Sequence, residues 1–250
     1  MTSWKLTIEY DGSKYSGWQA QINARTVQGE LKKAAEDFFR AEVDIQGSGR
    51  TDSGVHALAQ IASLRANVKH GPQAAELLKG LNDRLPADVV VLSAEPAGPR
   101  FHPRHDAVSR TYQYQISTRK SAFAKRYVWW VKEPLDLAVM QHAAATLAGR
   151  HNFICFRAPD PSKPDESTIV VVESASLDLE DDRIIFQITA SHFLWRMVRR
   201  VVGVLVKLGK GEITEDDFAQ LLAGKCDKRL DVASWTAPAS GLFLETVRYR

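Results

Sequence analysis

The segment at residues 47–57, GSGRTDSGVHA, places an aspartate, an arginine and a histidine among three glycines. A carboxylate such as that of Asp52 is nucleophilic when it is ionised, and a nearby guanidinium favours the ionised form and can orient it through two parallel hydrogen bonds. Arg50 is close in sequence, and a second arginine can arrive from elsewhere in the fold. Glycines let a backbone approach a ligand closely. The segment therefore predicts a turn that presents Asp52 for chemistry; the simpler alternative is a turn in which Asp52 caps backbone amides.

Three better-known sites fit this segment poorly. A Walker loop requires a lysine after its last glycine, and none follows Gly54. A nucleophile elbow requires glycines two positions before and after its serine, whereas Thr51 and Val55 flank Ser53. His56 has no cysteine or histidine at the spacing of a metal site.

A second arginine is offered by the segment FLWRMVRRVVGVLVKLGKG at residues 193–211. Its apolar residues recur at helical spacing, which predicts a helix over 193–208. Arg196, Arg199 and Arg200 then share a neighbouring face. A solvated basic face is the alternative interpretation. However, three arginines without a nearby acid favour an anionic partner.

The segment RTYQYQI at residues 110–116 alternates as a β-strand does, with Tyr112, Tyr114 and Ile116 on one face. Arg110 and Arg119 flank these aromatic residues. Unstacked RNA bases stack on such rings while arginines bind the phosphates. The alternative is that this face belongs to the hydrophobic core.

Positive charge is concentrated in two parts of a chain whose net charge is only +3. Residues 100–132 contain eight Lys or Arg and one acid, Asp106, and residues 183–211 contain six Lys or Arg and no acid. Such clusters indicate an anionic partner such as a nucleic acid, unless both are merely solvated faces.

Hydrophobic periodicity predicts an α+β fold made of two halves, residues 1–106 and 107–250, each with the order β-α-β-β-α-β of ferredoxin-like folds. In the first half the strands are expected near 5–10, 43–46, 58–66 and 88–96, with helices starting at Thr26 and Pro72. In the second, strands near 110–116 and 127–131, a helix over 135–147, a hairpin over 167–190 and a strand over 241–249 are expected. The proline-rich stretch at 95–105 marks the boundary.

Composition excludes several classes of protein. No apolar run reaches the roughly 18 residues of a membrane span, and the N-terminus has no signal-peptide pattern. Cys155 and Cys226 lie far apart and outside any CxxC motif, which argues against both a zinc site and a disulfide scaffold. The sequence thus predicts a protein of the reducing cytoplasm.

Taken together, four segments resemble the TruA family of tRNA pseudouridine synthases along nearly the whole chain. They are EYDGSKYSGWQ, GSGRTDSGVHALAQ, FHPRHDAVSRTYQYQI and FLWRMVRRVVGVLVKLGKG, in the family's order. The resemblance implies two ferredoxin-like halves with antiparallel sheets joined side by side and an active cleft between them. It also implies a homodimer that binds the anticodon stem-loop of tRNA and converts uridines at positions 38, 39 and 40. Neither a metal nor an organic cofactor is expected.

The resemblance also implies roles for individual residues. Asp52 is the nucleophile, Arg199 pairs with it, and Tyr112 contacts the target base. Arg50 is expected near the RNA backbone or the flipped nucleotide, and Arg110 and Arg196 are further candidates for substrate binding. Attack at C6 of the base and at C1′ of the sugar both remain open, as does the group that removes the C5 proton, Tyr112 or Asp52.

Three departures from the family pattern leave the target RNA open. Ser53 replaces the usual alanine, Trp195 and Arg196 stand where histidines or Arg-His are common, and residues 167–177 lack a frequent arginine. Alternative functions are therefore action on other uridines or another RNA, or RNA binding without catalysis. A carboxylate hydrolase using Asp52 and His56 is a further alternative, but no second acid or base for it is evident.

Overall fold

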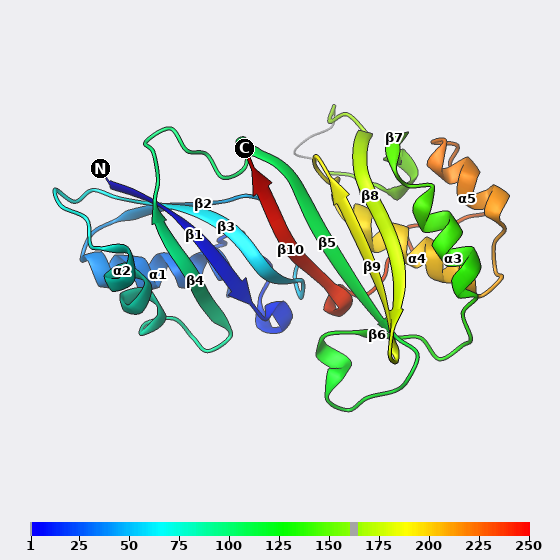
Figure 1. Ribbon diagram of the computed structural model, residues 1–250, viewed down its shortest axis with the longest axis horizontal. Coiled ribbons are helices and arrows are strands. Elements are labelled where there is room, and N and C mark those ends of the chain that lie inside the picture. Colours follow the sequence, from blue (N-terminus) through cyan, green and yellow to red (C-terminus); the bar gives the residue numbers. More distant parts are fainter. Residues whose placement is uncertain (1, 161–164) are drawn as a thin grey trace. The chain divides into compact units, whose positions relative to one another are not determined.

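The computed structural model describes residues 2–160 and 165–250, which form two compact units (Figure 1). One unit contains the chain up to Val108 together with Phe243–Arg250, and the other contains Ser109–Leu242. The sequence placed the division at 106/107 and kept the last strand in the second half. The last strand instead clusters with the first unit because Phe243 and Leu244 pair in parallel with His56 and Ala57.

The first unit has the predicted order β-α-β-β-α-β. Its elements are β1 (Thr2–Tyr10), α1 (Val27–Phe39), β2 (Val43–Gly47), β3 (His56–Ala66), α2 (Ala74–Asn82) and β4 (Val89–Pro96), with β10 (Leu242–Tyr249) added from the C-terminus. The sheet has the order β4-β1-β3, and both β2 and β10 pair with β3. All of these pairs are antiparallel except that of β10 with β3.

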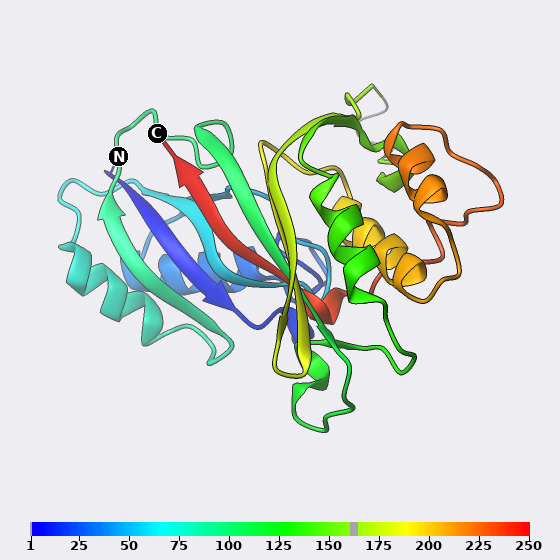
Figure 2. The ribbon, with the colours of Figure 1, turned by 45° about the vertical axis from the view of Figure 1, so that its right-hand side comes forward.

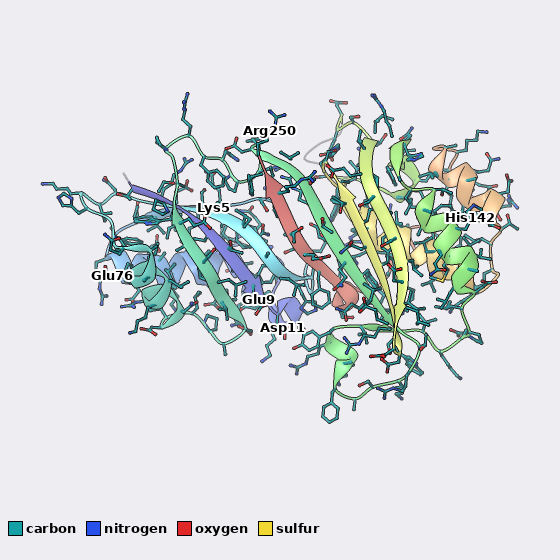
Figure 3. The ribbon with its side chains drawn as sticks, viewed as in Figure 1. Lys5, Glu9, Asp11, Glu76, His142 and Arg250 are labelled. Atoms are coloured by element: carbon teal, nitrogen blue, oxygen red, sulfur yellow. A yellow bond between two sulfur atoms is a disulfide. The ribbon has the colours of Figure 1, made fainter. Side chains whose placement is uncertain are left out.

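The two helices of this unit cover one face of its sheet (Figures 1 and 2). Helix α1 begins at Thr26, whose side chain accepts a hydrogen bond from the Gly29 amide and so caps the helix. Strand β1 alternates as predicted: Leu6, Ile8 and Tyr10 are buried. Lys5 and Glu9 alternate with these residues and are more exposed (Figure 3).

The second unit also has an antiparallel sheet, with the order β5-β9-β8-β7. Its strands are β5 (Ala107–Ser117), β6 (Trp129–Trp130), β7 (Gly149–Asn152), β8 (Ile169–Glu180) and β9 (Arg183–Ala190), and its helices are α3 (Leu137–Ala145), α4 (Met197–Gly209) and α5 (Glu215–Leu222). The hairpin predicted over 167–190 is confirmed by the pairing of β8 with β9, and Asp181 at its turn is in the left-handed region at φ 53°. Helix α3 packs against β8 and α4. The α+β fold class predicted from the sequence is thus confirmed.

Short 3-10 helices complete the two units. They are η1 (Gly12–Lys14), η2 (Ala124–Arg126), η3 (Phe153–Phe156) and η4 (Ala239–Gly241). Within the described residues, no helix is long and apolar enough to cross a membrane.

Helix α4 begins four residues later than predicted. Arg196 adopts a left-handed conformation with φ 60°, so the regular helix starts at Met197 rather than at Phe193. Hydrophobic spacing cannot reveal such a break, because Met197, Val201 and Leu205 keep the buried stripe that the pattern predicted.

The prediction that the two cysteines do not form a disulfide is wrong. Cys155 in η3 and Cys226 after α5 are bonded to each other, with their Cα atoms 5.3 Å apart. They are 71 residues apart in sequence, and only the packing of α5 against η3 brings them together. Sequence spacing alone carries no information about that approach.

Candidate active site

The turn that carries Asp52 connects β2 to β3 and is fixed at its first residues. The Ser48 amide donates to the Ile61 carbonyl at 2.7 Å, and its hydroxyl donates to Gln60 Oε1 at 2.6 Å. Gln60 Nε2 in turn donates to the Gly49 carbonyl at 3.0 Å. Because the Gln60 side chain is fully buried, these bonds are shielded from competing water and hold the entry to the turn in one conformation.

The residues on both sides of Asp52 are hydrogen bonded as well. The Tyr10 hydroxyl and Thr51 Oγ1 lie 2.7 Å apart, and the Trp18 amide donates to the Thr51 carbonyl at 3.1 Å. The Val55 amide donates to the Asp52 carbonyl at 3.2 Å. Burial raises the pKa of Tyr10 to about 12, so its hydroxyl stays protonated at neutral pH. The backbone around the half-buried Asp52 is therefore held in place.

Residues 10–18, which we call the cradle segment, support this turn from behind. Gly17 has φ 90°, and a β-carbon there would lie 2.5 Å from the Thr51 carbonyl oxygen. The hydroxyl of Ser53 and the amide of Gly54 both donate to the Tyr15 carbonyl, at 3.1 and 3.3 Å. The close contact between the backbones of the cradle segment and the turn requires glycine at position 17.

His56 belongs to the support of the turn. Its ring is buried, and its Nδ1 lies 3.1 Å from the Gly12 amide and 3.2 Å from Asp11 Oδ1. Figure 3 shows Asp11 beside η1, just after β1. The ring also stacks on Phe243, with centroids 4.7 Å apart. The described residues contain no group of three or more His, Cys, Asp or Glu that could hold a metal ion.

Arg50, on the same turn, is exposed. Its Nε donates to Gln19 Oε1 at 3.1 Å, and Gln19 Nε2 donates to Gln28 Oε1 at 2.8 Å. Because Gln28 lies in α1, the Arg50 side chain is tied to the rigid part of the first unit.

In the second unit, Arg199 is fixed by a reciprocal pair of bonds with Ala237. Arg199 Nε donates to the Ala237 carbonyl at 2.7 Å, and the Ala237 amide donates to the Arg199 carbonyl at 3.0 Å. Gly203, one turn further along α4, contacts the Trp235 carbonyl so closely that a β-carbon would overlap it. The guanidinium therefore has a defined position against residues 235–237.

The alternating aromatic residues of β5 have different environments. Tyr114 and Ile116 are fully buried and form part of the core. The Tyr114 hydroxyl donates to the Pro238 carbonyl at 2.8 Å, and burial raises the pKa of Tyr114, with the Arg199 charge opposing the shift. Tyr112 is half-buried, and its ring meets that of Phe193 edge to face with centroids 4.9 Å apart. The core interpretation of this strand therefore holds for Tyr114 and Ile116, while Tyr112 keeps an accessible surface.

The other predicted arginines of this unit point in different directions. Arg110 Nη1 donates to the Ser191 carbonyl at 2.9 Å. Arg196 is exposed, with its guanidinium 5.0 Å from the Trp195 ring centroid. Arg200 is buried and donates to the Arg157 carbonyl, so the three arginines do not share one face.

The structure brings Arg50 and Asp52 together on one turn of the first unit, and Arg110, Tyr112, Arg196 and Arg199 lie in the second. Sequence reasoning missed the supporting residues of the turn, Tyr10, Gly17 and Gln60. The two glycines and the aromatic residues of the cradle segment were the available signal, because such a pattern is typical of a close backbone approach.

The chain is similar to known proteins along most of its length. A family described as tRNA pseudouridine synthase matches residues 6–106 and 143–250. The chain is 38% identical to a tRNA pseudouridine synthase A of Treponema denticola, with 98% of this chain and 91% of the relative covered. It is also 38% identical to the enzyme of that name from Acetivibrio thermocellus, with both chains fully covered, and 39% identical to that of Thermoanaerobacter sp., with 98% of each covered.

Proposed function

Since the chain belongs to the tRNA pseudouridine synthases, enzymes that isomerise uridine to pseudouridine in tRNA, we propose that it modifies uridines 38, 39 and 40 of the anticodon stem-loop with Asp52 as nucleophile. The observation that carries this proposal is the turn of residues 48–55. It holds a half-buried carboxylate between hydrogen-bonded neighbours. A preorganised nucleophile of this kind avoids the entropy loss of orienting it during the reaction.

The reaction exchanges one bond of the nucleoside for another. The N1–C1′ bond breaks, the uracil turns, a C5–C1′ bond forms, the C5 proton leaves, and N1 gains a proton, so no atoms are gained or lost. An ionised carboxylate can add to C6 of the base or to C1′ of the sugar without prior deprotonation, and it can leave again afterwards. The target uridine must first leave its stack, at a cost of a few kcal/mol.

Arg199 and Tyr112 have proposed roles beside Asp52. The bond from Arg199 Nε to the Ala237 carbonyl fixes the position of the guanidinium. We assign Arg199 to pair with Asp52 and thereby hold its charge and orientation. The accessible surface of Tyr112 suits contact with the target base, and either the Tyr112 hydroxyl or Asp52 accepts the C5 proton.

Arg50, Arg110 and Arg196 are assigned to binding the RNA. Arg50 and Arg196 are exposed cations, and the bond between Arg110 and Ser191 orients the third side chain. Phosphate contacts of this kind supply most of the affinity of proteins for nucleic acids. The resemblance further supports a cytoplasmic homodimer in which the first unit carries the catalytic turn and the second unit carries the RNA-contacting strand and the basic helix.

Asp52→Asn tests the nucleophile. The variant should bind tRNA as the wild type does but release no tritium from 5-tritiated uridine in tRNA, since an amide is a poor nucleophile. Mapping of pseudouridine in the wild-type product, by chemical probing or mass spectrometry, tests the target positions. Appreciable release by the folded variant would remove Asp52 from its role, and pseudouridine at other uridines would replace the assigned targets.

The supporting roles need separate variants. Arg199→Ala should lower kcat by about 10²- to 10³-fold, as expected when a charge-stabilising donor is lost, and Arg199→Lys should restore part of it. Tyr112→Leu keeps an apolar contact but lacks the hydroxyl, so kcat should fall more than tRNA binding does. Wild-type rates in either variant would contradict the corresponding role.

A further inference from the structure

The segment at residues 119–132, RKSAFAKRYVWWVK, is a surface that the roles assigned above do not use. It contains five Lys or Arg and no acid, and it also contains four aromatic residues. We call this segment the basic aromatic loop. It includes η2 and β6 and follows β5 directly.

The second part of the basic aromatic loop is fixed to the core of the second unit. Strand β6 pairs in parallel with the end of β5, and the Val131 amide donates to the Ser117 carbonyl at 3.0 Å. Val128 and Val131 are buried, and the Trp129 ring meets Tyr114 edge to face with centroids 6.4 Å apart. The loop therefore projects its remaining side chains from a rigid base.

Three aromatic side chains of the loop face solvent. Phe123 is 94% exposed, Trp130 39% and Tyr127 38%. Single exposed apolar residues are ordinary on protein surfaces, but three large aromatic residues within eight positions are typical of a binding surface. Phe123 is the most exposed of the three, so its ring is the best placed for another planar group to stack on.

Cations accompany these rings. The Lys120 ammonium lies 5.3 Å from the centroid of the Trp130 ring. Lys125 and Arg126 form the last turn of η2, directly after Phe123 and Ala124. Arg119 donates to Asp182 at 2.7 Å, so its charge is compensated and it anchors the loop. The loop thus combines exposed rings with cations and contributes no acid of its own.

We propose that the basic aromatic loop binds unpaired nucleotides of the RNA substrate outside the reacting uridine, with Phe123 stacking on a base and Lys125 contacting a phosphate. This rests on the proposed function, which makes RNA the substrate. Single-stranded RNA is bound by this combination, because every base has a π-face and every nucleotide a charge. A surface for another protein is less consistent with the composition, since charged residues, and lysine above all, are depleted at the centre of such interfaces.

Equilibrium binding of RNA by the full-length protein tests this proposal. The probes are an unmodified tRNA transcript and a fully paired RNA duplex of the same length. Their binding is measured by fluorescence anisotropy at several salt concentrations. The variants are Phe123→Ala and Lys125→Ala, and the matched control is Leu179→Ala. Leu179 is 53% exposed on β8 between Asp178 and Glu180, where no RNA contact is expected. All three changes are at the surface, and thermal melting verifies that each variant is folded.

Phe123→Ala should weaken tRNA binding by about 5- to 100-fold without changing its salt dependence, because stacking rather than charge is lost. Its binding to the duplex should equal that of the wild type. Lys125→Ala should reduce the slope of log affinity against log salt by about 0.7 to 0.9, the value for one phosphate contact. Leu179→Ala should bind both probes as the wild type does.

Unchanged tRNA affinity in Phe123→Ala would overturn the proposal, and so would an equal loss of affinity for the duplex. If Phe123→Ala changed the oligomeric state of the protein in the absence of RNA, the loop would be a protein interface instead. Tritium release by the wild type keeps this test separate from that of the proposed function. If the wild type showed no turnover but its tRNA binding depended on Phe123, the proposed function would be rejected and RNA binding by the loop supported. If the wild type showed turnover but its tRNA binding did not depend on Phe123, the proposed function would stand and RNA binding by the loop would be rejected.

Discussion

The substitution Gly17→Ala tests whether the cradle segment positions Asp52. The new β-carbon would lie 2.5 Å from the Thr51 carbonyl oxygen and 3.2 Å from the Asp52 carbonyl carbon. It would therefore contact the backbone of the residues that carry the proposed nucleophile. The side chain of Asp52 itself is not altered, so a loss of kcat in a variant that is folded and binds tRNA reports on the position of that side chain.

The size of the effect follows from two contributions. Alanine at φ 90° is strained by about 1–3 kcal/mol, which lowers the free energy of unfolding. The β-carbon and the Thr51 oxygen must also move apart by about 0.5 Å, because β-carbons in proteins essentially never lie closer than 3.0 Å to another atom of this kind. A misplacement of about 1 Å costs up to about 100-fold in rate, so we expect kcat to fall by about 10- to 100-fold.

The assay is tritium release at saturating tRNA, together with thermal melting and tRNA affinity. The control is Gly49→Ala on the same turn, because a β-carbon there has no atom within 4 Å and the backbone is not left-handed. Gly49→Ala should keep the wild-type kcat and stability. A wild-type kcat in Gly17→Ala, or an equal loss in Gly49→Ala, would refute the positioning argument.

Two further predictions concern stability. Closing a loop across the 71 residues between Cys155 and Cys226 stabilises the fold by about 4 kcal/mol in the chain-entropy description, so Cys226→Ser should lower the free energy of unfolding by up to that amount. Urea unfolding measures this difference. An added reductant should lower the free energy of unfolding of the wild type but not that of the variant. Burial raises the pKa of Tyr10 to about 12, so the unfolded chain loses this proton at lower pH than the folded one. The free energy of unfolding should therefore fall between pH 10 and pH 12, by up to about 3 kcal/mol from this group. In Tyr10→Phe it should fall less steeply with pH than in the wild type. Equal slopes would contradict the assignment.

The sequence was sufficient for the order β-α-β-β-α-β in the first 96 residues of the first unit, because the signals there are local, but it did not place β10 in this unit. The capping of α1 by Thr26 and the alternation of Leu6, Ile8 and Tyr10 depend on residues a few positions apart. The turn containing Asp52 was likewise recognised from its own glycines. Each of these features is encoded within one element or one connection.

What the sequence could not reveal depends on contacts between distant segments. The left-handed conformation of Arg196 interrupts a helical pattern that is otherwise continuous. Cys155 and Cys226 meet through the packing of α5 on η3, and Arg200 turns inward to the Arg157 carbonyl. Tyr10 and Tyr15, which help to hold the turn that carries Asp52, lie in the cradle segment some 40 positions earlier. A single sequence has no local signal for such pairings.

The return of Phe243–Arg250 to the first unit has a consequence for synthesis of the protein on the ribosome. The second unit is one continuous stretch of chain, Ser109–Leu242, and can fold as soon as that stretch has emerged. The first unit is synthesised mostly before the second, but it lacks the strand formed by Phe243–Arg250 until the whole of the second unit has been made. Because the ring of His56 stacks on Phe243, the support of the turn that carries Asp52 is completed only after the second unit has been made. A chain that ends before Phe243 would carry every proposed catalytic residue and still lack part of their support.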